Sequence, residues 1–186
     1  MNTTEYAHEV VREIERAVAA IAPEEAERLV DLVLDARRLF IAGAGRSGFA
    51  VKAFAMRLMH LGFTSFVVGE TATPSATAED VILIGSGSGE TASLVAIAEK
   101  AKKIGARLAL ITVVPDSRIG RLADALVRIQ APTPKPERRG RTASIQPMGT
   151  LFEQTMLVLL DSVVLRLTER MGVDADAMFA RHANLE

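Results

Sequence analysis

Two glycine-rich stretches, each following an apolar run, contain the residues best suited to bind an anionic ligand. The first is "LFIAGAGRSGF", residues 39–49, and the second is "IGSGSGETAS", residues 84–93. Glycine lets the backbone approach an anion closely, and the start of a following helix offers free N–H groups and the positive end of a dipole. Because both stretches have the pattern strand, turn, helix, we expect them at the carboxyl ends of parallel strands that face one crevice.

The first stretch also matches the G-x-G-x-x-G fingerprint of a dinucleotide-binding turn, through Gly43, Gly45 and Gly48. Glu70 ends the next apolar run, at the spacing where an acid would meet a ribose hydroxyl. The short chain leaves little room for the substrate domain of a dehydrogenase, however, and the second stretch suits one compact phosphate. We therefore favour a phosphate ester as ligand, and expect Glu70 to cap or line the crevice.

The second stretch interleaves glycines with hydroxyl side chains, for which a tight turn without a ligand is the alternative interpretation. Glu90 is unfavourable beside a phosphate, so its side chain is expected to point away or to accept a substrate hydroxyl. In the first stretch, Arg46 and Ser47 are expected to contact the sugar or its phosphate, unless Arg46 forms an ion pair with Glu70 or Glu90. The predicted phosphate-binding residues of the second stretch are Ser86, Gly87, Ser88, Gly89 and Thr91, with Glu90 beside them.

The composition argues against several classes of protein. The 186 residues carry a net charge of −1, with 4% aromatic residues and no cysteine. A nucleic-acid binder would need a basic surface, and a base-stacking platform would need aromatic residues. Without cysteine there are no disulfides, thiolate nucleophiles or cysteine zinc sites, and no two histidines have metal-ligand spacing with acids, so we expect no metal. An acidic amphipathic start and an apolar stretch interrupted by Asp161 predict a cytoplasmic chain without membrane contact.

Hydrophobic periodicity predicts one α/β domain. From residue 37, apolar runs alternate with helical patterns in an order typical of a doubly wound parallel sheet. Two helices precede it, one over residues 5–20 and one that Pro23 opens, and a long helix from about Met148 to Met171 follows it. We divide the single domain, residues 1–186, into N-terminal helices (1–36), a glycine-loop core (37–131), a basic proline-rich loop (132–147) and C-terminal helices (148–186).

Together these motifs resemble the sugar isomerase (SIS) domain family, and within it the 6-phospho-3-hexuloisomerases. The resemblance rests on "GAGRSGFAVKAFAMRLMHLGF", "VVGET", "SGSGETASLV", "QPMGTLFEQ" and "RHANLE", and covers nearly the whole chain. It implies a three-layer α-β-α sandwich around a five-stranded parallel sheet of flavodoxin-like type, a homotetramer, and no cofactor or metal. It also implies the interconversion of D-arabino-hex-3-ulose 6-phosphate and D-fructose 6-phosphate in the ribulose monophosphate pathway, paired with a hexulose-phosphate synthase.

The resemblance also implies two catalytic residues. Moving a carbonyl from C3 to C2 passes through an enediolate, for which a partly desolvated carboxylate suits proton abstraction and an imidazole suits proton transfer between oxygens. Glu153 resembles the family's proton acceptor, and His182 resembles a residue for oxygen protonation or ring opening, in its own or a neighbouring subunit's site. From the residues alone, Glu153 could instead complement a helix dipole, and His182 could be exposed on a frayed tail. His8 and His60 are expected to be structural.

Several alternatives stay open. The apolar face of "LFEQTMLVLLDSVVLRL" is expected to form an oligomer interface, with ordinary packing on the sheet as the alternative. The chain could instead be a sugar-phosphate-sensing SIS module, although its short acidic N-terminal segment offers no DNA-binding element, or another SIS isomerase of aldose and ketose phosphates. The basic run is either a solvated connection or a lid that attracts an anionic sugar, and comprises Lys135, Arg138, Arg139 and Arg141.

Overall fold

A parallel sheet lies at the centre of the computed structural model, which describes residues 1–132 and 143–185. Its strands lie in the order β2-β1-β3-β4-β5, and every neighbouring pair is parallel. This order is the flavodoxin-like one, so the predicted α/β class with a doubly wound, five-stranded parallel sheet is confirmed. The strands are β1 (Leu39–Gly43), β2 (Ser65–Val67), β3 (Val81–Gly85), β4 (Arg107–Thr112) and β5 (Ala125–Arg128).

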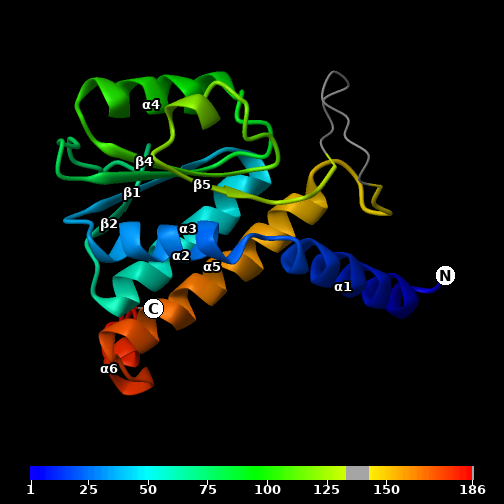
Figure 1. The fold of residues 1–186 in the computed structure, drawn as a ribbon. Coiled ribbons are helices and arrows are strands. Elements are labelled where there is room, and N and C mark those ends of the chain that lie inside the picture. The colour runs from blue at the N-terminus through cyan, green and yellow to red at the C-terminus, as the bar shows by residue number, and fades with distance from the viewer. Residues whose placement is uncertain (133–142, 186) are drawn as a thin grey trace.

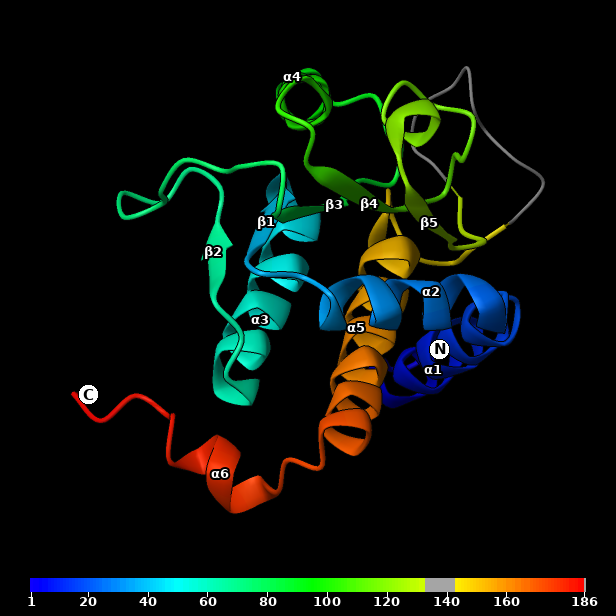
Figure 2. The same ribbon diagram turned by 60° about the vertical axis from the view of Figure 1, so that its left-hand side comes forward.

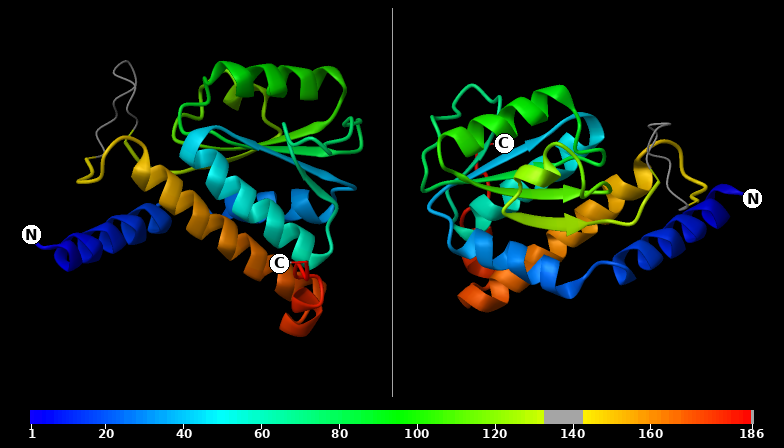
Figure 3. Two further views of the ribbon diagram at one scale, coloured as in Figure 1. Left: turned by 180° about the vertical axis from the view of Figure 1, so that it is seen from behind. Right: turned by 45° about the horizontal axis from the view of Figure 1, so that its top comes forward.

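Helices cover both faces of the sheet (Figure 1). One face is covered by α4 and the 3₁₀ turn η1, and the other by α2 and α3, with α5 crossing both on that side (Figure 2). Helix α1 contacts α5 and extends away from the body, as both views in Figure 3 show. The helices are α1 (Thr3–Ala19), α2 (Pro23–Leu34), α3 (Gly45–Leu61), α4 (Ala92–Lys103), α5 (Thr150–Met171) and α6 (Ala175–Phe179), and η1 spans Gly120–Leu122.

Local sequence signals explain where these helices begin and end. Asn2 and Glu5 form a capping box at the start of α1, with the Asn2 side chain accepting from the Glu5 N–H. Pro23 occupies the first turn of α2, where a missing N–H costs nothing. Gly62 ends α3 in the left-handed conformation, which glycine adopts without the steric cost of a Cβ.

The sheet separates two hydrophobic layers. Along β1, Leu39 and Ile41 belong to the layer shared with α2, α3 and α5, whereas Phe40 and Ala42 belong to the layer under α4. Neighbouring residues of β1 are therefore buried on opposite faces, which explains why its apolar run is unbroken rather than alternating.

Helix α5 buries most of its apolar face inside its own chain. Its exposed large apolar residues are Leu157, Val158, Leu165 and Met171. Ordinary packing on α1, α2 and α3 therefore accounts for most of the face that the sequence assigned to an oligomer interface. The buried apolar residues of α5 are Leu151, Phe152, Met156, Leu159, Leu160, Val163, Val164 and Leu167.

The basic run Lys135, Arg138, Arg139 and Arg141 lies outside the described residues, so the lid hypothesis stays a prediction, as does the four-part division of the domain. In the part of the chain that the structure describes, no helix is both long enough and apolar enough to span a membrane.

A buried ion pair joins the segments that enter β1 and β3, at the sheet edge opposite the glycine turns. Arg38 donates two hydrogen bonds to the carboxylate of Asp80, at 2.9 and 2.6 Å, and Thr77 donates two more from its backbone N–H and its hydroxyl. Asp80 is completely buried. Burial raises the pKa of Asp80, but the bonds from Arg38 and Thr77 outweigh it, and the pKa is lowered.

Replacing Asp80 with Asn is expected to lower the free energy of unfolding by about 3 kcal/mol at pH 7, because Arg38 then loses its buried partner. The pKa of Asp80 is lower in the folded chain, so its contribution is complete above the unfolded pKa of about 4 and is lost as pH falls through the folded pKa. The stability gap between D80N and the wild type, measured by urea unfolding, should therefore shrink below about pH 4.

The neighbouring residue provides a matched control. Glu79 pairs with Arg37, and both side chains are well exposed. E79Q should change stability by at most about 1 kcal/mol, as surface pairs do. Equal stability of D80N, E79Q and the wild type at pH 7 would contradict the structural role given to Asp80.

Candidate active site

The two glycine turns open into one cavity of about 510 Å³ at the carboxyl edge of the sheet. Gly43 and Gly85, which end β1 and β3, are opposite one another in register. The direction of strand order reverses between β1 and β3, and ligands of open α/β sheets bind at such a point. The expectation that the two turns face one crevice is therefore confirmed. The cavity is lined by Ala44, Gly45, Arg46, Ser47, Gly87, Ser88, Val113, Pro132, Pro147, Met148, Gly149, Thr150, Phe152 and Glu153.

An ion pair between Arg46 and Glu153 lies in the wall of this cavity. Arg46 Nε donates to Glu153 Oε2 at 2.6 Å, which joins the first turn of α3 to the first turn of α5. The Glu153 side chain is 17% exposed and that of Arg46 is 65% exposed. The carboxylate is thus partly desolvated, while the guanidinium can turn toward a ligand.

Glu70 does not occupy either place considered for it from the sequence. Its carboxylate accepts from Lys52 Nζ at 2.7 Å, and it is not among the residues that line the cavity. The expectation that it caps or lines the crevice is wrong, because the turn after β2 carries it to the outer side of α3.

The second glycine turn contributes some of its predicted residues to the cavity and keeps others behind it. Gly87 and Ser88 line the cavity. Ser86 is buried and its Oγ accepts from the Gly89 N–H at 3.2 Å, so its hydroxyl shapes the turn. The predicted roles of Ser86 and Gly89 in binding phosphate stay predictions.

Two further predicted residues lie at the start of α4. Glu90 Oε1 accepts from the Arg118 backbone N–H at 2.9 Å, so this carboxylate oxygen is directed toward the loop that precedes η1. Thr91 is the N-cap of α4, although its side chain makes no capping hydrogen bond. Neither residue lines the cavity, and the N–H groups of the first turn of α4 remain the donors expected there.

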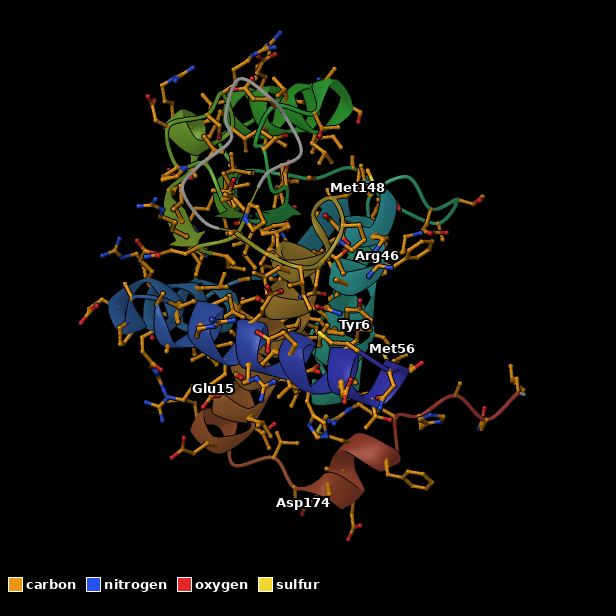
Figure 4. The ribbon with its side chains drawn as sticks, turned by 90° about the vertical axis from the view of Figure 1, so that its right-hand side faces the viewer. Tyr6, Glu15, Arg46, Met56, Met148 and Asp174 are labelled. Atoms are coloured by element: carbon orange, nitrogen blue, oxygen red, sulfur yellow. The ribbon has the colours of Figure 1, made fainter. Side chains whose placement is uncertain are left out.

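One wall of the cavity consists of residues that were not predicted as part of the site. Pro147, Met148 and Gly149 lead into α5, and Met148 has a left-handed backbone with φ 56°. The Pro147 carbonyl accepts both the backbone N–H and the hydroxyl of Thr150, which fixes the first turn of the helix. Figure 4 shows Met148 on the same side of the molecule as Arg46, and both residues line the cavity. The stretch "QPMGTLFEQ" contains these residues beside Glu153, and it is the sequence signal that could have indicated them.

His182 lies away from the cavity of its own chain. Its ring stacks on that of His60, with ring centroids 5.4 Å apart. His60 is in the last turn of α3 and Arg46 in the first, which is about 21 Å along the helix axis. His60 is buried, and burial together with Arg57 and His182 lowers its pKa. The structure therefore brings Glu153 to the glycine turns, and leaves His182 at the opposite end of α3.

A second, largely apolar groove of about 310 Å³ adjoins the cavity. Arg46 and Glu153 line both, so their ion pair stands between them. Phe49 and Leu157, both exposed, form part of the groove between α3 and α5. Among residues 1–132 and 143–185, no group of three or more His, Asp or Glu could hold a metal ion. The expected absence of a metal or cofactor stays an expectation.

Comparison with known proteins gives consistent similarities. The family model of the SIS domain matches residues 32–158. The 3-hexulose-6-phosphate isomerase of Bacillus subtilis is 48% identical over 186 residues, which is 100% of both chains. That of Mycobacterium gastri is 43% identical over 174 residues, covering 94% of this chain and 86% of the other. A crystal structure from Methanococcus jannaschii, for which a function of 3-hexulose-6-phosphate isomerase was inferred, has a TM-score of 0.84 and 34% identity, covering 98% of this chain and 99% of that one.

The second glycine turn has no space for a side chain at Gly89. This residue has φ 60°, and an added Cβ would lie 2.0 Å from Ser117 Oγ. Gly172 has φ 63° and nothing within 4 Å of an added Cβ, so G172A measures the cost of the left-handed conformation alone, about 1–2 kcal/mol. Urea unfolding should show a clearly larger loss for G89A than for G172A. If both variants lose the same free energy of unfolding, the Ser117 side chain can move aside without a stability cost, and the packing of this turn does not require glycine.

Proposed function

The chain belongs to the SIS domain family, and from that premise we propose that it is an isomerase that interconverts D-arabino-hex-3-ulose 6-phosphate and D-fructose 6-phosphate. One observation carries the proposal. Both glycine turns and Glu153 line a single cavity, in a chain that is 48% identical from end to end to an enzyme named for this reaction. The site residues that follow are our assignments.

The phosphate of the substrate binds at the second glycine turn. Gly87 and Ser88 line the cavity there, and the first turn of α4 supplies free N–H groups and a positive dipole end. Ser47 and Arg46 reach the same cavity from the first turn of α3. Arg46 is exposed enough to leave Glu153 and neutralise the phosphate or the enediolate.

Glu153 acts as the base. In the direction of fructose 6-phosphate, it removes the proton from C2 of the 3-ulose, and the electron pair forms the C2–C3 double bond of an enediolate. The proton returns at C3, and a proton moves from the C2 oxygen to the C3 oxygen, so that the carbonyl ends at C2. The partly buried carboxylate beside the cavity has the position that this transfer requires.

Replacing Glu153 with Gln is expected to lower kcat by roughly 10³-fold or more. Fructose 6-phosphate should still bind, because Arg46 and the second glycine turn remain. Turnover is measured by coupling fructose 6-phosphate formation to a dehydrogenase, and binding by calorimetry. Glu24 is a matched control, because it is an exposed acid in the first turn of α2. E24Q should keep full activity, and substantial activity of E153Q would show that the base is another residue.

The same assay separates the isomerase from a sugar-phosphate-sensing module. A sensor would bind the sugar phosphate and leave its carbonyl at the same carbon. If the wild type binds the sugar phosphate but shows no turnover, the isomerase proposal is wrong and a sensor is favoured.

We further propose that the chain forms a homotetramer in which His182 serves a neighbouring subunit. The groove beside Glu153 exposes Phe49 and Leu157, and α1 extends from the body with Val11 exposed, so apolar surface is available to another copy. His182 stacks on His60, at the opposite end of α3 from Arg46, but lies at the surface, where it can reach another subunit's site. There it protonates an oxygen or opens the sugar ring.

Mixed oligomers test the placement of His182. E153Q and H182A are each expected to be inactive alone, but oligomers assembled from both chains should recover activity, because some sites then combine an intact Glu153 with a partner's intact His182. The activity of coexpressed, doubly tagged oligomers measures this recovery. Recovery only to the sum of the separate variants would mean that both residues act in one chain.

The cellular setting follows from the reaction. We propose a cytoplasmic enzyme that works beside a hexulose-phosphate synthase in the ribulose monophosphate pathway, in formaldehyde assimilation or in the reverse supply of ribulose 5-phosphate.

A further inference from the structure

Glu13 is a buried carboxylate on α1, far from Glu153 in sequence. Only 5% of its surface is exposed. Its Oε2 accepts from Ser144 Oγ at 2.6 Å and from Gln146 Nε2 at 3.0 Å, and its Oε1 accepts from the Ile145 backbone N–H at 2.9 Å. Burial raises the pKa of Glu13, but these bonds, helped by the charge of Arg16, outweigh it and the pKa is lowered. The acceptor is therefore a charged one at neutral pH.

The segment that Glu13 holds continues directly into the wall of the cavity. Ser144 Oγ also accepts from the Gln146 backbone N–H at 3.0 Å, which closes a tight turn on the Glu13 side chain. The next residues, Pro147, Met148 and Gly149, line the cavity. Met148 has a left-handed backbone, which costs a non-glycine residue about 1–3 kcal/mol and persists only where its surroundings fix it.

An apolar side chain at position 13 could hold α1 against α5 without the cost of burying a charge. The carboxylate, unlike an apolar side chain, fixes the conformation of one loop, because it accepts hydrogen bonds from a backbone N–H and from two side chains of that loop. Those contacts are made to the loop before α5, where they have no part in the packing of the helix pair.

We propose that Glu13 is a positioning residue that fixes residues 144–149 as a wall of the sugar-phosphate cavity, and so couples helix α1 to the active site. The inference rests on the function proposed for that cavity. It makes the N-terminal helix part of the catalytic unit, although none of its residues lines the cavity.

Two substitutions on α1 test this role. E13Q keeps the size of the side chain but turns an NH₂ group toward donors, so one or two of the three hydrogen bonds are lost. E15Q is the matched control, because Glu15 is exposed on the same helix, two residues away (Figure 4). Hydrogen exchange followed by mass spectrometry reports on residues 144–150, and steady-state kinetics gives kcat and KM.

In E13Q, exchange over residues 144–150 is expected to accelerate and kcat/KM to fall about tenfold, mainly through KM, since a loss of this size matches one buried hydrogen bond to a charged group. E15Q should match the wild type in both measurements. S144A removes a donor from the loop side, and should shift both quantities in the same direction by a smaller amount, even if E13Q does not fold. In an E13Q/S144A double variant the two effects should not add, because both act through one contact.

The outcomes separate this inference from the function on which it rests. Unchanged exchange over residues 144–150 in E13Q, or faster exchange with kcat/KM equal to that of E15Q, overturns the positioning role. An inactive wild type overturns the proposed function, while the exchange data still decide whether Glu13 holds the loop.

Discussion

The site depends on the close approach of Val51 to the ends of two neighbouring strands. A Cβ added at Gly43 would lie 2.8 Å from Val51 Cγ2, and one added at Gly85 would lie 2.6 Å from Val51 Cγ1. Side chains larger than hydrogen at both positions would push α3 away from the sheet. Because Val51 is one to two turns from the start of α3, this contact also fixes the first turn, which carries Arg46 and Ser47, over the carboxyl edge of β1 and β3.

Helix α5 also packs closely against the ends of these strands, at glycines where a side chain would not fit. A Cβ at Gly85 would lie 2.8 Å from Met156 Sδ, and one at Gly87 would lie 3.2 Å from the ring of Phe152. Phe152 and Met156 are four residues apart and share the inward face of the helix. Glu153 is therefore placed on the adjoining face, beside Arg46. Sheet, α3 and α5 converge on three glycines, and the ion pair at the cavity is a consequence of that convergence.

The order of these contacts explains what could be predicted from the sequence. The strands and helices depend on local signals, such as the apolar run of β1 and Pro23 at the start of α2, and these were predicted correctly. The meeting of the two glycine turns was also predictable, because parallel strands present their carboxyl ends on one edge. The pairing of Arg46 with Glu153 was not, since it joins residues 107 positions apart and depends on how α5 crosses α3.

The cavity wall formed by residues 147–149 and its contact with Glu13 on α1 could not be predicted from the sequence for the same reason. Met148 has a left-handed backbone that no local rule gives to methionine, and Glu13 resembles any other acid on an amphipathic helix. On α1, Val11 and Val18 are exposed, whereas Glu13 and Ala17 are buried. A periodic pattern shows which residues share a face, but not where a loop 130 residues later will meet it.

The nucleotide fingerprint in the first glycine turn is explained by packing. Gly48 meets the Gly43 carbonyl so closely that an added Cβ would lie 2.9 Å from its oxygen, which is the strand-to-helix contact that the last glycine of G-x-G-x-x-G serves in dinucleotide-binding folds. The features that would bind a dinucleotide are different here. Glu70, at the spacing of a ribose-binding acid, pairs with Lys52 outside the cavity, and Glu153 with the loop before α5 closes the space beside the turn. The glycines of the first turn therefore indicate how a helix packs against a parallel strand, and do not by themselves indicate a dinucleotide.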